Sequence, residues 1–183
     1  MKVKQPLVRF AIESKLNTKT KGKNHIMSSK IAFFDIDHSI ADAAWRDNLM
    51  GNWDEYHAKS IDDESISAMV ALVDALYCDQ WATVGLTGRP EKFRQITEAW
   101  LFKRCVMLDE LIMRPNEVYD GAAIFKQGAV LKRCEKLRNP LVLVFDDRDD
   151  VISAMQTSGI NCVSLQVHAG ANSIVGRPPY VAK

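Results

Sequence analysis

The sequence lacks the features of a membrane-spanning or disulfide-rich protein. No apolar run approaches the length needed to cross a bilayer. Four widely scattered cysteines form no Cys-x-x-Cys pair, and no paired histidines accompany them: Cys78, Cys105, Cys134 and Cys162. This spacing argues against a zinc site or a disulfide framework, so we expect a reduced, cytoplasmic protein. A Gly-x-x-x-x-Gly-Lys-[Ser/Thr] motif is also absent, which excludes a P-loop kinase within this chain.

The net charge of +1 hides an uneven distribution of charge along the chain. Residues 1–30 hold eight Lys or Arg and one acid, whereas the remaining residues carry a net charge of −6. We expect a basic, flexible arm at 1–29, a folded domain at 30–167 and a loose tail at 168–183. The arm could touch nucleic acid or an anionic surface. Because Met27 resembles a natural start before the first strand, we instead expect no essential role for the arm.

Predicted strands and helices alternate through the folded domain. Short apolar runs predict strands at about 31–36, 81–86, 111–113, 141–145 and 161–165. Amphipathic segments between them predict helices, the first of which Ser60 to Asp63 can cap. This alternation predicts an α/β fold, a three-layer sandwich with a five-stranded parallel sheet and helices on both faces. A polar insert at 41–60 adds only a small cap.

Carboxylates follow two of the buried strands directly. Asp35 and Asp37 end the first strand, and alternation along an extended chain points both toward one site. Asp146 and Asp147 repeat this arrangement after the strand at 141–145. In parallel sheets, ligands bind beyond the carboxyl ends of the strands. Because clustered acids repel one another without a cation, the pattern favours a Mg²⁺ site over a merely polar surface.

Two further features at the same edge favour a bound phosphate. Thr87-Gly88-Arg89 offers a hydroxyl, a residue that permits close approach and a cation, all where a helix begins. Lys126 is placed near a helix start before the Asp146 strand, within reach of the same edge. The alternatives are an ordinary turn before a helix and a solvated lysine.

The four motifs together resemble a known family. Asp35-Ile-Asp37-His-Ser39, Thr87, Lys126 and Asp146-Asp147 are similar in order and position to the motifs of the haloacid dehalogenase superfamily of phosphotransferases. The resemblance spans residues 31 to about 167 and implies a Rossmannoid sheet. Finer details are similar to the 3′-phosphatase domain of bacteriophage polynucleotide kinase: Thr87-Gly-Arg89, Leu111-Ile-Met-Arg114-Pro115 and Phe145-Asp-Asp-Arg148.

The resemblance implies a role for each matching residue. Asp35 would be the nucleophile that forms an aspartyl-phosphate, and Asp37 would protonate the leaving oxygen and then activate water. Thr87 and Lys126 would hold phosphoryl oxygens, and Arg89 would contact the substrate phosphate.

The metal site implied by the resemblance is made of acids from both strand ends. Asp35, the backbone carbonyl of Asp37, Asp146 and Asp147 would bind Mg²⁺. Two positions depart from the family pattern, because Ser39 replaces the commoner Thr and Ala122 stands where an acid is frequent.

These observations predict a Mg²⁺-dependent phosphomonoesterase that removes 3′-phosphates from nucleic-acid ends and has no membrane partner. If a phage encodes the chain, we expect the protein in the cytoplasm of the host cell. The alternatives are a phosphatase of free nucleotides or other small phosphomonoesters, and a receiver-like or inactive interaction module. The aromatic residues Trp53, Tyr56 and His57 of the insert could stack on a base, or could anchor the insert.

Overall fold

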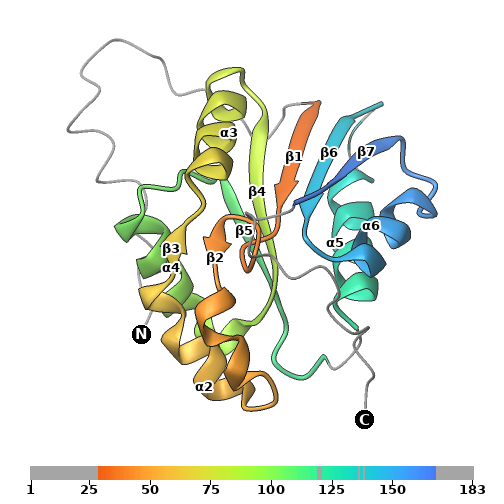
Figure 1. Ribbon diagram of the computed structural model, residues 1–183. Coiled ribbons are helices and arrows are strands. Elements are labelled where there is room, and N and C mark those ends of the chain that lie inside the picture. Colours follow the sequence, from red (N-terminus) through yellow and green to blue (C-terminus); the bar gives the residue numbers. More distant parts are fainter. Residues whose placement is uncertain (1–28, 119–120, 136, 138, 168–183) are drawn as a thin grey trace, which may run out of the picture.

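Five parallel strands form the central sheet of the computed structural model, which describes residues 29–167 except 119, 120, 136 and 138. The strands are β1 (Lys30–Phe34), β4 (Ala82–Pro90), β5 (Glu110–Arg114), β6 (Leu141–Asp146) and β7 (Cys162–Gln166). Their order is β5-β4-β1-β6-β7, and all neighbours are parallel (Figure 1). The predicted arm and tail lie outside the described residues. The predicted five-stranded parallel sheet is confirmed.

Helices cover both faces of the sheet and complete the predicted three layers. Figure 1 shows α3 (Ser67–Cys78) and α4 (Arg94–Lys103) on one side, and α5 (Ala122–Cys134) and α6 (Asp149–Gln156) on the other. Parallel strands need crossover connections, and these helices provide them. Among the described residues, no helix is long and apolar enough to cross a membrane.

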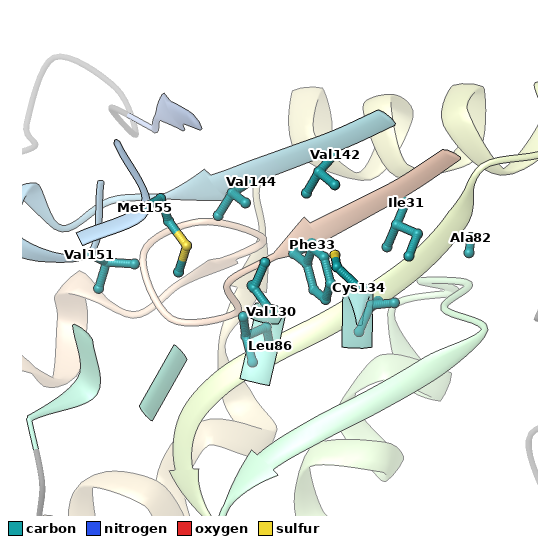
Figure 2. Close-up of a cluster of buried hydrophobic side chains, with 11 residues drawn as sticks. Ile31, Phe33, Ala82, Leu86, Val130, Cys134, Val142, Val144, Val151 and Met155 are labelled. Atoms are coloured by element: carbon teal, nitrogen blue, oxygen red, sulfur yellow. The ribbon is translucent and has the colours of Figure 1, made fainter. Parts of the chain in front are cut away.

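Strand β1 lies at the centre of the sheet and contributes to two hydrophobic cores. Ile31 and Phe33 join the core beneath α5 and α6, together with Val130 and Met155 (Figure 2). Ala32 and Phe34 join the core beneath α3 and α4. Since alternate side chains of a strand point to opposite faces, one uninterrupted apolar run supplies both cores.

The insert after β1 is longer than predicted and has its own secondary structure. It contains β2 (Ala41–Asp42), η2 (Ala44–Leu49), α2 (Trp53–Ala58), η3 (Lys59–Asp62) and β3 (Glu64–Ser65). The strands β2 and β3 pair antiparallel. The insert is therefore a small, folded unit at the carboxyl end of β1.

The predicted capping role of Ser60 to Asp63 is wrong. Helix α3 begins at Ser67, its N-cap is Ile66, and no side chain caps it. Ser60 and Asp63 are instead fully buried and bonded to arginines of the insert and of β4. Their polar groups are thus committed to long-range contacts and are not available to a local helix end.

Two other boundaries differ from those predicted, and both bear on the site. Strand β4 continues through the Thr87-Gly88-Arg89 segment to Pro90, with an irregularity in its pairing between Thr87 and Pro90. A short 3-10 helix, η4 (Glu91–Phe93), precedes α4. Helix α5 begins at Ala122, so that Lys126 lies in its second turn.

Replacing Phe33 by alanine should lower the free energy of unfolding by about 3–5 kcal/mol, because its fully buried ring would leave a cavity at the centre of the sheet. The matched change Ile124→Ala removes a side chain that is 65% exposed and should cost within about 0.5 kcal/mol. Urea unfolding of both variants measures the difference. Equal losses would contradict the assignment of Phe33 to the core.

Candidate active site

The carboxyl ends of β1 and β6 bring the predicted acidic residues together. Asp35 directly follows β1, and its backbone N–H donates to the carbonyl of Phe145 at 2.9 Å, which extends the strand pairing by one step. Asp146 is the last residue of β6. Neighbouring parallel strands that end in step place their terminal carboxylates side by side.

Lys126 of α5 lies between these two carboxylates. Its Nζ is 2.8 Å from Oδ1 of Asp35 and 2.7 Å from Oδ2 of Asp146. All three side chains are buried, which would be costly for any of them alone. Although burial lowers the pKa of Lys126, the carboxylates of Asp146 and Asp35 outweigh it and raise that pKa above its usual range. The lysine is therefore held in its charged form.

Asp35, Asp146 and Asp147 form a group that could hold a metal ion. One carboxylate oxygen from each lies within 4.8 Å of the others. Burial raises the pKa of Asp35, and although Lys126 opposes the change, the neighbouring acids Asp146, Asp147 and Asp37 add to it. The three carboxylates therefore carry more negative charge than the single ammonium of Lys126 neutralises. An all-oxygen donor set with unbalanced negative charge fits a hard divalent cation.

Asp37 has a different environment from Asp35. The Nη2 of Arg89 donates to Oδ1 of Asp37 at 2.6 Å, and Nε donates to Oδ2 at 3.0 Å. The Nη2 of Arg46 donates to Oδ1 as well. Burial raises the pKa of Asp37, but the two guanidinium groups outweigh burial and hold that pKa below its usual range. Asp37 is ionised, and its carboxylate is fixed in orientation.

A second carboxylate, Asp63, completes this arginine cluster. Its oxygens accept from Nε of Arg46 at 2.8 Å, from Nη2 of Arg46 at 2.6 Å and from Nε1 of Trp45 at 2.9 Å. Arg46 also lies over the ring of Tyr56, 4.0 Å from its centroid. Both Arg46 and Asp63 are fully buried.

Sequence reasoning did not find Arg46 or Asp63. These residues could have been recognised only as charged residues of an insert beside the site. The sequence of the insert shows no periodicity that marks them as buried. Contacts from Arg46 to Asp37 and Asp63 join residues 9 and 17 positions apart, across several short elements of the insert.

Thr87 and Arg89 both lie at the predicted edge, but in different contacts. The Thr87 hydroxyl accepts from the backbone N–H of Arg89 at 3.2 Å, and both side chains are fully buried. The guanidinium of Arg89 is occupied by Asp37. Its predicted contact with a substrate phosphate, like the predicted contacts of Thr87 and Lys126, stays a prediction.

The aromatic residues of the insert contact one another, and the stacking of any of them on a base stays a prediction. Tyr56 and His57 are buried, and the ring of His57 lies 5.1 Å from that of Phe93, so these two residues anchor the insert. Trp53 is 39% exposed and contacts both of them. His38 is buried beneath the insert, with Nε2 3.3 Å from the hydroxyl of Tyr56.

A parallel sheet with paired acids, a lysine and a hydroxyl at its carboxyl edge is the arrangement expected of a haloacid dehalogenase-type phosphatase, and the family model identifies the class. The family model of the polynucleotide kinase PNKP phosphatase domain matches residues 29–171. The chain therefore belongs to this family and is a phosphatase domain of the haloacid dehalogenase type. No curated protein sequence matches the chain.

Solved structures share the fold of this chain. One chain in the structure of the Pnkp1/Rnl/Hen1 complex is 21% identical to this chain, with a TM-score of 0.65. The match covers 86% of this chain and 51% of that one. A predicted phosphatase from Clostridium acetobutylicum is 17% identical, with a TM-score of 0.56 and coverage of 79% and 86%. A haloacid dehalogenase-like hydrolase from Streptococcus pneumoniae is 12% identical, with a TM-score of 0.55 and coverage of 74% and 84%. The chain thus spans about half the length of the first of these relatives.

Acid should destabilise the protein partly through His57. Burial lowers the pKa of its imidazole from 6.5 to about 4, and although Asp37 opposes this change, Arg89 and Arg46 support it. Between pH 6.5 and 4 the unfolded chain therefore binds a proton that the folded protein does not, and stability falls. Above pH 6.5 this contribution is fully present.

The non-titrating variant His57→Gln should lose less stability than the wild type over the same interval. Urea unfolding at pH 7, 5.5 and 4 measures both slopes. Parallel slopes for the two proteins would show that His57 does not titrate in this way.

Proposed function

We propose that the protein is a Mg²⁺-dependent phosphomonoesterase that acts through an aspartyl-phosphate on Asp35 and removes 3′-phosphates from nucleic-acid ends. The observation that carries the proposal is the pairing of Lys126 with both Asp35 and Asp146 in a chain of the PNKP phosphatase family. The site's acids, its buried lysine and its hydroxyl are the groups that phosphoryl transfer uses.

Asp35, Asp146 and Asp147, with the backbone carbonyl of Asp37, would hold Mg²⁺. The ion would neutralise charge between the nucleophile and the phosphate when bound. Lys126 would supply a second positive charge at the same place, because its Nζ already lies 2.8 Å from the nucleophilic carboxylate. The Thr87 hydroxyl would hold a phosphoryl oxygen.

In the first step, an Oδ of Asp35 attacks phosphorus, and the bond between phosphorus and the ester oxygen breaks. The leaving oxygen takes a proton from the carboxyl group of Asp37. In the second step, Asp37 takes a proton from water, the water oxygen attacks phosphorus, and the bond to Asp35 breaks. Phosphate leaves, and Asp37 holds its proton again.

Asp37 needs a proton before the first step, whereas its contacts with Arg46 and Arg89 favour the ionised form. The negative charge of the bound dianionic phosphate would oppose the ionised form of Asp37 and raise its pKa. Arg89 would contact the phosphate while it stays beside Asp37.

The small insert favours a nucleic-acid end over a free nucleotide. It consists of short helices and a two-stranded sheet, and the carboxylate of Asp37 beneath it keeps 17% of its surface exposed. A phosphate at the end of a longer chain can reach such a site while the rest of that chain stays outside. A chain in a second solved structure, of the Pnkp1/Rnl/Hen1 RNA repair complex, is 20% identical to this chain, and that setting supports this substrate class. Against it stands the net charge of −6 on residues 31–183.

The purified protein should release phosphate with Mg²⁺ from a 3′-phosphorylated oligonucleotide faster than from the 5′-phosphorylated oligonucleotide or from mononucleotides. Asp35→Asn should abolish this release, by more than about 10³-fold, because it removes the nucleophile. Circular dichroism checks that the variant folds. Faster release from mononucleotides would favour the second candidate, a nucleotide phosphatase, and no release from any substrate would sink both.

Chelation should remove activity, and Mg²⁺ should restore it. Saturating Mg²⁺ at 100 times its dissociation constant should also raise the free energy of unfolding by about 2.7 kcal/mol, a readout that needs no turnover. Asp147→Asn should weaken this stabilisation, because it removes one charged ligand, whereas Asp42→Asn in the insert serves as the matched control. A Mg²⁺ effect of the same size in all three proteins would place the ion elsewhere.

A further inference from the structure

The guanidinium of Arg89 has more donors than Asp37 can accept. Its Nε and Nη2 donate to the two oxygens of Asp37, and Nη2 also lies 3.4 Å from Asp63. The remaining nitrogen, Nη1, carries two further N–H groups and faces away from both carboxylates. Arg89 is fully buried, so water does not serve these donors. Buried donors without an acceptor cost about 1–3 kcal/mol each.

Two neutral hydroxyls accept from Nη1. Nη1 is 3.2 Å from the Oγ of Ser60 in η3 and 3.3 Å from the Oγ1 of Thr97 in α4. Both side chains are fully buried. Ser60 precedes Arg89 in the sequence, and Thr97 follows it. We infer that Ser60 and Thr97 are positioning residues whose hydroxyls hold Arg89 so that Nε and Nη2 face Asp37. The inference rests on the proposed role of Asp37 as the acid and base.

The neutrality of these acceptors is part of the argument. Arg46 and Arg89 already face two carboxylates, Asp37 and Asp63, so formal charge in this cluster is balanced. A third carboxylate at Nη1 would draw the guanidinium away from Asp37. Hydroxyls satisfy the donors without that competition.

Helix α4 and the residue after it also hold Asp63, which directly follows the element that carries Ser60. The Nε1 of Trp100 donates to the backbone carbonyl of Asp63 at 2.8 Å, and Nε of Arg104 donates to the same carbonyl at 2.9 Å. Residues three apart on a helix share a face, so Thr97 and Trp100 both point toward the insert, and Arg104 directly after α4 contacts it as well. The position of Nη1 is therefore set by a rigid helix and by a segment bonded to that helix.

The double variant Ser60→Ala/Thr97→Val should let the guanidinium tilt and so misplace Asp37. We expect kcat on a 3′-phosphorylated oligonucleotide to fall about 10- to 100-fold with little change in KM. Thr97→Ser, which keeps the hydroxyl, should retain most of the activity. Thr83→Val is the matched control: Thr83 is also buried, but its Oγ1 contacts Asp109 at 3.1 Å near the opposite end of β4. It should lose stability and keep kcat.

A leaving group that needs no proton separates positioning from general damage. The double variant should produce a normal burst of nitrophenolate from p-nitrophenyl phosphate while cleaving the 3′-phosphate slowly, because only the alkoxide that leaves the 3′-phosphate needs a proton from Asp37. Equal losses on both substrates would assign the hydroxyls a merely structural role and overturn the inference.

A measurement without turnover keeps the inference separate from the proposed activity. The Arg89 Nε–H signal in ¹⁵N NMR, assigned by its loss in Arg89→Lys, should exchange slowly with solvent in the wild type and in Thr83→Val. It should exchange faster in the double variant. Unchanged exchange overturns the inference. A wild type that releases no phosphate from any ester, with the NMR result as expected, would instead sink the proposed function alone.

Discussion

The site depends on the pairing of buried carboxylates with buried cations, and the two halves of the site are balanced differently. Asp37 and Asp63 face two guanidinium groups, so that half is formally neutral and fixed by its own residues. Asp35 and Asp146 share the single ammonium of Lys126, and Asp147 adds a third acid nearby. Burying unbalanced charge is costly, so only the second half calls for a further cation.

The sequence predicted the half of the site that rests on strands. The apolar run before Asp35 and the run before Asp146 each identify a buried strand, and parallel strands end at one edge, so the meeting of these acids follows from local pattern and topology alone. Arg46 and Asp63 could not be predicted in this way. They lie in an insert of short 3-10 and helical turns, where no period tells a buried charge from a solvated one.

The separation of Asp35 from Asp37 also escaped the alternation rule, for a local reason. Strand β1 ends at Phe34, and the backbone N–H groups of Ser39, Ile40 and Ala41 all turn back to the carbonyl of Ile36. His38 has a positive φ of 62°, which sharpens this turn. Past the end of a strand, residues two apart no longer share a face, so Asp37 reaches the arginines of β4 and the insert while Asp35 reaches Lys126.

The insert that follows this turn is held in place at both of its ends. Its far end is bonded to α4 through the carbonyl of Asp63, and its Arg46 is bonded to Asp37. Lifting the insert would break both attachments and strand two buried charges, at a cost of several kcal/mol. Substrate entry by a hinged lid is therefore disfavoured. The side chain of Asp37, which is 17% exposed beside the insert, can be reached without breaking either attachment.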